Sequence, residues 1–181
     1  MSCCILETGR LILRPPELSD LPNMVPLVGD FEVSKNLGRV AHPYTEAHAR
    51  EFYARAQTQR ASGTDFNFAI QRKDDSAYLG GCGLHLKEGV FELGYWLGKS
   101  HWGMGYATEA AKKLAGFAFH DLKATRLLAA WFHDNPASGR VLAKLGFEHQ
   151  GSEPRDCLAR GHQVYCHAVV LHREKFGRVA A

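Results

Sequence analysis

The stretch ELGYWLGKSHWGMGYATEA, Glu92–Ala110, joins two hydrophobic patterns of different period. It starts within an apolar run, Val90–Leu97, which is typical of a buried strand. From Ala107 onward, apolar side chains recur every three or four residues, as on one buried face of a helix. These positions are Ala107, Ala110, Ala111, Leu114, Phe117 and Ala118. With Gly103 and Gly105 between the two patterns, the sequence predicts a strand, a glycine-rich turn and a helix in direct succession.

This succession is suited to binding an anion. Glycines let the backbone approach a ligand closely. The first turn of a helix adds N–H groups that lack intrahelical acceptors, together with the positive end of the helix dipole. We therefore expect a phosphate-binding site, to which Thr108 can add a hydroxyl group. Its residues are Trp102, Gly103, Met104, Gly105, Tyr106, Ala107 and Thr108.

Other phosphate-binding turns fit this spacing less well. The glycines follow neither G-x-G-x-x-G nor G-x-x-x-x-G-K-[ST], so a Rossmann turn or a P-loop is not supported. The alternative interpretation is that the glycines serve only to form a tight turn and that the turn binds no ligand.

Strand and helix patterns continue on both sides of the turn. Before it we expect strands at 10–15, 67–72, 77–86 and 90–97, the last three as an antiparallel meander, and helices at 21–28 and 44–60. After it we expect a strand at 126–132, a helix between the Asn135 cap and Gly146, and strands at 147–151 and 163–171. The pattern predicts one α+β domain over residues 1–181, with a mixed sheet and packed helices.

Composition narrows the class of protein. The 181 residues suit a single domain. No apolar run reaches the ~18 to 20 residues that span a bilayer. The N-terminus does not resemble a signal peptide. We therefore expect a cytoplasmic protein without membrane contact. The 22 basic and 19 acidic residues give a net charge of +3, too small and scattered to favour nucleic-acid binding.

The five cysteines show no C-x-x-C pair, and their number is odd, so reduced thiols are expected rather than a disulfide framework. A metal site at Cys157, His162, Cys166 and His167 is the sharper alternative. Because their spacing matches none of the common zinc patterns, we expect no metal.

Residues Trp102–Ala110 resemble the acetyl-CoA pyrophosphate loop of the GNAT superfamily, [QR]-x-x-G-x-[GA]. Gly105 and Ala107 match its last two places, and Trp102 stands where Gln or Arg is usual. Three further segments resemble the branch of ribosomal-protein N-terminal acetyltransferases: TGRLILRP from Thr8, HPYT within 41–49, and NPASGRVLAKLGF from Asn135. The resemblance spans about 8–176, which we take as the core of the domain.

The resemblance implies a seven-stranded, mixed but mostly antiparallel sheet with helices on both faces, splayed between its fourth and fifth strands, 90–97 and 126–132. Acetyl-CoA would be the co-substrate, with its pantetheine arm bonded to the backbone of Tyr95, Trp96 and Leu97. The acceptor would be a primary amine, in this branch a protein N-terminus. A small-molecule amine such as an aminoglycoside or polyamine, and a coenzyme-binding module without turnover, remain alternatives. We expect a monomer or a homodimer.

Two residues are candidates for catalysis. Glu92 lies in the apolar strand that borders the expected cleft, where partial desolvation would raise its pKa and suit it as the base. A Glu that merely solubilises the strand is the alternative. The resemblance implies that Asn135 contacts the coenzyme arm and that the Ser138 hydroxyl lies near the thioester sulfur. A plain helix cap and first-turn residue would explain both equally well. Tyr165 is a rival acid, and Glu109 and Lys113 are expected to form an i,i+4 pair.

Overall fold

The strands of the computed structural model, which describes residues 4–179, lie in one sheet of order β1-β2-β3-β4-β5-β6-β8-β7. All neighbouring strands are antiparallel except β5 and β6, which are parallel. The strands are β1 Leu6–Glu7, β2 Leu11–Arg14, β3 Asp65–Arg72, β4 Tyr78–Lys87, β5 Val90–Leu97, β6 Arg126–Phe132, β7 Glu148–Cys157 and β8 His162–His172. The expected meander, β3 to β5, and the mixed, mostly antiparallel sheet are confirmed.

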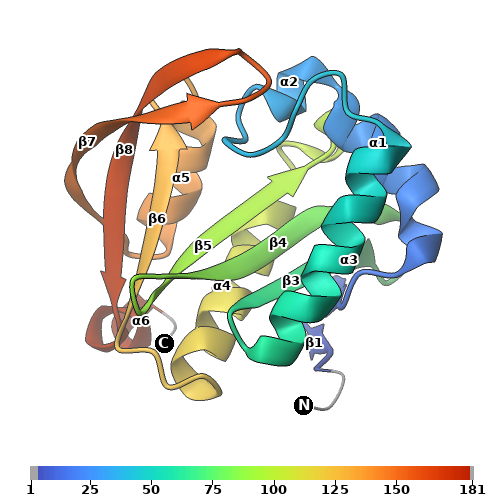
Figure 1. Ribbon diagram of the computed structural model, residues 1–181. Helices are drawn as coiled ribbons and strands as arrows, with labels where there is room; N and C mark the ends of the chain where they lie inside the picture. Colours follow the sequence, from blue (N-terminus) through green and yellow to red (C-terminus); the bar gives the residue numbers. More distant parts are fainter. Residues whose placement is uncertain (1–3, 180–181) are drawn as a thin grey trace.

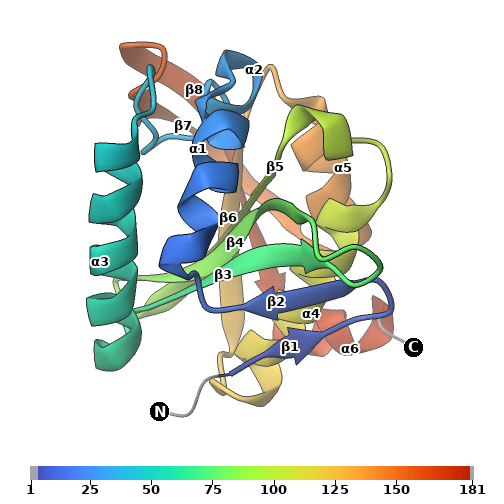
Figure 2. The same ribbon diagram turned by 90° about the vertical axis from the view of Figure 1, so that its right-hand side faces the viewer.

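Helices cover both faces of the sheet, as Figure 2 shows. The helix α1 packs on β4 and α3 packs on β3, on one face; α4 packs on β4 and β5 from the other face. The helices are α1 Leu21–Gly29, α2 Phe31–Ser34, α3 Glu46–Ser62, α4 Tyr106–His120, α5 Pro136–Lys144 and α6 Arg173–Val179, with short 3-10 turns η1 Leu18–Asp20 and η2 Lys99–His101.

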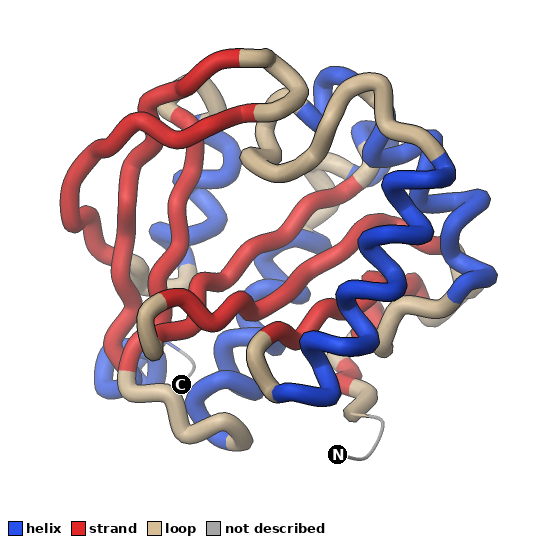
Figure 3. Tube along the Cα trace, in the orientation of Figure 1, coloured by secondary structure: helices blue, strands red, loops and turns tan. Residues whose placement is uncertain are grey.

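The sheet opens between β5 and β6 (Figures 1 and 3). Within the described chain, their ladder consists of two residue pairs, Phe91 with Leu127 and Glu92 with Leu128. Beyond Glu92 the two strands diverge, and the rest of β5 is paired on its other edge with β4. The splay therefore lies between the two strands for which it was expected.

The helix after the glycine turn packs as its periodicity predicts. Ala110, Ala111, Leu114 and Ala118 of α4 are fully buried, and Phe117 contacts Phe66 and Phe68 of β3 edge to face. This apolar stripe packs α4 against the strands, and the packing positions the start of the helix relative to the end of β5.

The strand count is a correction, since the described residues form eight strands rather than seven. The strand β1 is two residues long and pairs with β2, so it is too short to show a period of two. The prediction for β7 was too short, because the strand continues from Glu148 to Cys157 through a polar segment that contains Pro154. As an edge strand it has one free side, where proline is tolerated and apolar alternation is not required.

Candidate active site

The glycine turn has the conformation that an anion site needs. Gly103 and Gly105 have φ of 76° and 81°, in the left-handed region that favours glycine. The helix α4 begins at Tyr106, and its N-cap is Gly105, which has no side chain to accept from the first-turn N–H groups. A Cβ built on Gly103 would meet nothing within 4 Å. The turn and the helix start therefore fit a phosphate group.

The turn is held from outside by Arg10, which lies just before β2. Its Nη1 donates to the carbonyl oxygen of Met104 at 3.0 Å, and its guanidinium lies 4.5 Å from the ring centre of Tyr106. Its Nε also donates to Glu109 at 2.7 Å. The N-terminal hairpin and the first turn of α4 thus fix the path of the glycine turn.

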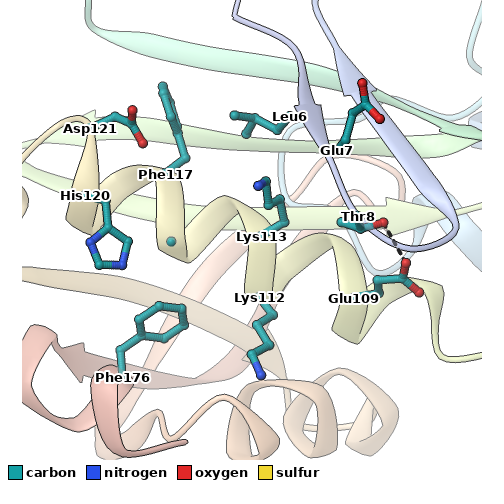
Figure 4. Close-up of a pocket in the computed structure, with 11 residues that line it drawn as sticks. Leu6, Glu7, Thr8, Glu109, Lys112, Lys113, Phe117, His120, Asp121 and Phe176 are labelled. Carbon is teal, nitrogen blue, oxygen red and sulfur yellow. Dashed lines mark hydrogen bonds between the residues drawn. The ribbon is translucent and has the colours of Figure 1, made fainter. Parts of the chain in front are cut away.

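The role expected for Glu109 was wrong. Its carboxylate does not pair with Lys113 but accepts hydrogen bonds from the Thr8 hydroxyl at 2.6 Å and from the Arg10 N–H at 2.9 Å. Figure 4 shows the bond from Thr8. The physical reason is that these donors reach Glu109 from another part of the chain, which helical spacing cannot reveal. Although burial opposes it, the bonds from Thr8 and Arg10 lower the pKa of Glu109.

Trp102 has a definite partner although it departs from the usual Gln or Arg. Its indole N–H donates to the carbonyl oxygen of Leu97 at 2.9 Å, which closes the segment between β5 and the turn. Leu97 is one of the backbone positions expected to contact the coenzyme arm, and its carbonyl is engaged by this bond.

On the opposite side of the splay, α5 presents Ser138 towards β5. The hydroxyl oxygens of Ser138 and Tyr95 are 2.9 Å apart, and the Tyr95 hydroxyl also donates to the Ser138 carbonyl oxygen at 3.1 Å. Burial raises the pKa of Tyr95 to about 12, so its hydroxyl keeps its proton at neutral pH. Tyr95 has a single hydrogen to donate: directed at the Ser138 hydroxyl, it leaves the Ser138 proton available to a ligand, whereas directed at the Ser138 carbonyl, it lets Ser138 donate to Tyr95. The sequence indicated Tyr95 only as a backbone contact.

Asn135 occupies the helix cap. Its side-chain oxygen accepts a hydrogen bond from the N–H of Ser138 at 3.3 Å. The next residue, Gly139, packs against the Trp131 ring of β6 so closely that a Cβ atom on Gly139 would lie 2.8 Å from that ring. The cap and this close contact set the position of Ser138 relative to the splay.

A hollow of about 470 Å³ lies on the face of the sheet covered by α1 and α3. Glu92, Gly94, Tyr95 and Trp96 of β5 line it, so it reaches the diverging part of that strand. Its charged lining residues are Arg39, Glu51, Arg55, Asp65 and Glu92, with His48 and His85. Its apolar lining includes Met24, Leu37, Val40, Tyr44, Phe52 and Trp96.

Glu92 lies on this hollow, but its surroundings differ from the apolar strand that was expected. Its Oε1 accepts from Nη1 of Arg155 on β7 at 2.9 Å, and Arg155 also binds Glu153 at 2.8 Å. Burial works against the charge of Arg155, but Glu153 and Glu92 raise its pKa. The cation comes from a strand far away in sequence, so no pattern around Glu92 could indicate it.

The tip of the β7–β8 hairpin lies on one side of the hollow. Leu158, which lines the hollow, donates its N–H to the Gly38 carbonyl at 3.1 Å, and Arg160 Nε donates to the Lys35 carbonyl at 2.7 Å. Arg160 also pairs with Asp134 at 2.7 Å. These bonds join the hairpin to the segment after α2 and to the β6–α5 connection.

Other candidates lie away from this arrangement. Tyr165 is 63% exposed and does not line the hollow. A separate hollow of about 430 Å³, shown in Figure 4, lies between β1, α4 and α6 and contains none of the expected site residues. Across residues 4–179 no group of three or more His, Cys, Asp or Glu side chains could hold a metal ion; Cys3 lies outside this range. No helix in that range is both long and apolar enough to span a membrane.

Comparison with known proteins assigns this fold to the acetyltransferases. Residues 10–148 match the family model described as an acetyltransferase (GNAT) domain. The chain is 33% identical over 150 residues to the uncharacterized N-acetyltransferase p20 of Bacillus licheniformis, covering 81% of this chain and 83% of p20. The protein belongs to the GNAT family of N-acetyltransferases, which use acetyl-CoA as co-substrate.

Solved structures share the fold at lower identity. Mycobacterium smegmatis RimJ, in complex with CoA-disulfide, superimposes with a TM-score of 0.82 at 19% identity, over 95% of this chain and 87% of RimJ. Spermidine N-acetyltransferase from Vibrio cholerae, in complex with CoA and spermine, superimposes with a TM-score of 0.79 at 16% identity, over 93% and 99% of the two chains.

Replacing Gly105 tests the anion site. We expect Gly105→Asp to weaken acetyl-CoA binding at least about tenfold. The repulsion between a carboxylate and a phosphate 4 Å apart is on the order of 4 kcal/mol, whereas a tenfold change in affinity corresponds to ~1.4 kcal/mol. Isothermal titration measures the affinity. Gly89→Asp is the matched control, since Gly89 also has a positive φ, 80°, but lies in the β4–β5 turn. Equal affinities for both folded variants would contradict the assignment.

Removing the Ser138 hydroxyl tests its proposed bond to the leaving sulfur. We expect Ser138→Ala to lower kcat by roughly 10- to 100-fold with little change in coenzyme affinity, since a bond to a charged acceptor contributes about 1.5 to 3 kcal/mol. Tyr95→Phe should lower kcat less, roughly two- to tenfold. Ser152→Ala, on β7, is the control. Thiol release at the wild-type rate by Ser138→Ala would leave Ser138 as a first-turn residue only.

Proposed function

We propose that this acetyltransferase transfers the acetyl group of acetyl-CoA to the N-terminal amine of a protein or peptide. The glycine turn, 102–108, would hold the pyrophosphate through backbone N–H groups, and the arm would lie between β5 and β6 against the backbone of 95–97. Asn135 would contact the arm and Ser138 the sulfur. The acceptor would enter through the hollow beneath α1 and α3, from the opposite face of the sheet.

The observation that carries the choice of acceptor is the charge of this hollow. Three carboxylates, Glu51, Asp65 and Glu92, line it together with two guanidinium groups, Arg39 and Arg55. This balance suits one ammonium group followed by an uncharged backbone. A polyamine would bring several positive charges next to the two arginines, which like-charge repulsion disfavours.

The apolar part of the lining supports the same acceptor. Tyr44, Phe52 and Trp96 provide surface for the first side chains of an extended peptide. An α-amine, with a pKa near 8, is also easier to deprotonate than a lysine or polyamine amine, whose pKa lies above about 10.

We further propose that Glu92 accepts the proton of the attacking amine, directly or through a water molecule. It lies on the same hollow as the acceptor, and one carboxylate oxygen is held by Arg155, which fixes the direction in which the other oxygen points. Loss of the amine proton frees the nitrogen lone pair to form the C–N bond; as the C–S bond breaks, its electrons leave with the sulfur.

The acceptor is tested by following thiol release from acetyl-CoA with a panel of amines. We expect kcat/KM to be highest for a peptide with a free N-terminus. For the same peptide with an acetylated N-terminus and a lysine as its only amine, kcat/KM should be at least tenfold lower. The reason is that at pH 7.5 the neutral fraction of an α-amine is roughly 100-fold greater than that of a lysine amine. Spermidine and an aminoglycoside complete the panel. Preference for spermidine would contradict the N-terminal acceptor, and binding of acetyl-CoA without release on any amine would indicate a non-catalytic module.

Glu92→Gln tests the base. The variant keeps the shape of the side chain but cannot accept a proton, so kcat/KM should fall by roughly 10²- to 10⁴-fold, the usual contribution of a positioned base. The loss should diminish at high pH, where the amine is already neutral. Glu153→Gln is the matched control, because it removes the other carboxylate bound to Arg155; its rate should stay within a few-fold of wild type. Equal activity of Glu92→Gln at every pH would show that another group removes the proton.

A further inference from the structure

Three ionisable side chains lie in a row across the strands beside the proposed acceptor. Asp65 of β3 is opposite His85 of β4, and His85 is opposite Glu92 of β5 in the antiparallel ladders. Directly opposite residues project from the same face of a sheet, with Cβ atoms about 4.5 to 5.5 Å apart. All three line the same hollow. Nothing in the sequence pattern of any one strand indicates this row.

Asp65 orients His85. The carboxylate oxygen Oδ2 lies 2.8 Å from Nδ1 of His85, and the Asp65 side chain is only 8% exposed. Since an ionised carboxylate can only accept hydrogen bonds, Nδ1 carries the hydrogen and a neutral imidazole then has its lone pair on Nε2. Among the described residues, no hydrogen bond to Nε2 is found, and the His85 side chain lines the hollow.

The ion pair with Arg155 favours transfer of a proton from Glu92 to a neighbouring group. Its negative charge attracts the Arg155 guanidinium at 2.9 Å, and this attraction is lost while Glu92 holds a proton. The neighbouring imidazole can take that proton, and the positive charge that results lies beside the ionised Asp65. The His85 side chain is 27% exposed, which allows the proton to reach bulk solvent.

We propose that His85, oriented by Asp65, is the second member of a proton relay that begins at Glu92. An N–H bond of the amine breaks and its proton goes to the Glu92 carboxylate. From there it passes through a bridging water to Nε2 of His85, and then to solvent. The imidazole ends the cycle neutral, and no further reactant is consumed. This inference rests on the proposed function, because the proton comes from the acceptor amine.

The surroundings of His85 favour the neutral ring that a relay needs. Burial and the nearby Arg39 lower the pKa of His85 below its ordinary value, against the opposing effects of Asp65 and Glu92. The charged groups facing it are therefore Asp65 from β3, Glu92 from β5, Arg39 from the segment before α3, and Arg155 behind Glu92. At neutral pH the imidazole is ready to accept a proton, and it loses this capacity as the pH falls through its pKa.

The test is a double-mutant cycle in kcat, with one saturating peptide acceptor across pH. We expect His85→Gln to lower kcat about 10²-fold at pH 7, at the low end for a positioned proton-transfer group, while acetyl-CoA affinity is unchanged. Combined with Glu92→Gln, the loss should match that of the worse single variant, because both groups carry the same proton. Losses that multiply would contradict the relay. His120→Gln, at the far end of α4, is the matched control.

Asp65→Asn separates a relay from a purely structural role. Because Asp65 raises the pKa of His85, the acid limb of the kcat profile should move to lower pH in this variant, while the plateau falls. A lower plateau with an unmoved limb would contradict the proposal, as would wild-type kinetics. Added imidazole should restore part of the activity of His85→Gly, and an absence of rescue in a variant that binds acetyl-CoA would also count against the relay.

Two outcomes keep this inference separate from the proposed function. No thiol release by the wild type with any amine would overturn the function itself, and the relay with it. Wild-type turnover together with an unaffected His85→Gln would overturn the relay alone. If the His85 variants do not fold, ¹⁵N NMR of the wild type remains decisive: the relay requires the Nδ1–H tautomer at neutral pH, and an Nε2–H tautomer would contradict it.

Discussion

The architecture of this acetyltransferase depends on the divergence of β5 from β6 after two paired residues. Antiparallel pairing with β4 on its other edge keeps β5 in the sheet, so the strand can leave β6 without losing all its partners. The opening places two faces of one strand in different environments. The Tyr95 side chain, which also borders the hollow, bonds to Ser138 of α5, and Glu92 lies on the hollow beneath α1 and α3. A single strand thus joins the proposed coenzyme side to the proposed acceptor side.

Contacts between distant segments connect the elements around this opening. Arg10, from the N-terminal hairpin, holds the glycine turn through Met104 and Glu109. Tyr95 and Ser138 connect the two sides of the splay, and Arg155 reaches from β7 to Glu92. Each is a polar contact between elements far apart in sequence. In the proposed function each has a counterpart: pyrophosphate binding, departure of the sulfur, and removal of the amine proton.

Local patterns were sufficient for the fold around the turn but not for these contacts. The buried stripe of α4 and the two glycines with positive φ follow from period and residue type, and so does the Asn135 cap. The two-residue β1 and the polar part of β7 lack a period that could reveal them. Glu109 was assigned to Lys113 by helical spacing, whereas its partners are Thr8 and Arg10. The row of Asp65, His85 and Glu92 depends on strand register, which spacing within one strand does not determine.

A crystal structure of the protein with coenzyme A tests most directly whether the turn at 102–108 and the opening of the sheet together form the coenzyme site. We expect pyrophosphate oxygens within about 2.7 to 3.2 Å of backbone nitrogens between Gly103 and Thr108. We also expect the pantetheine arm between β5 and β6, with its sulfur beside Ser138. Coenzyme bound elsewhere, for instance in the hollow between β1, α4 and α6, with the turn and the splay left empty, would contradict this assignment.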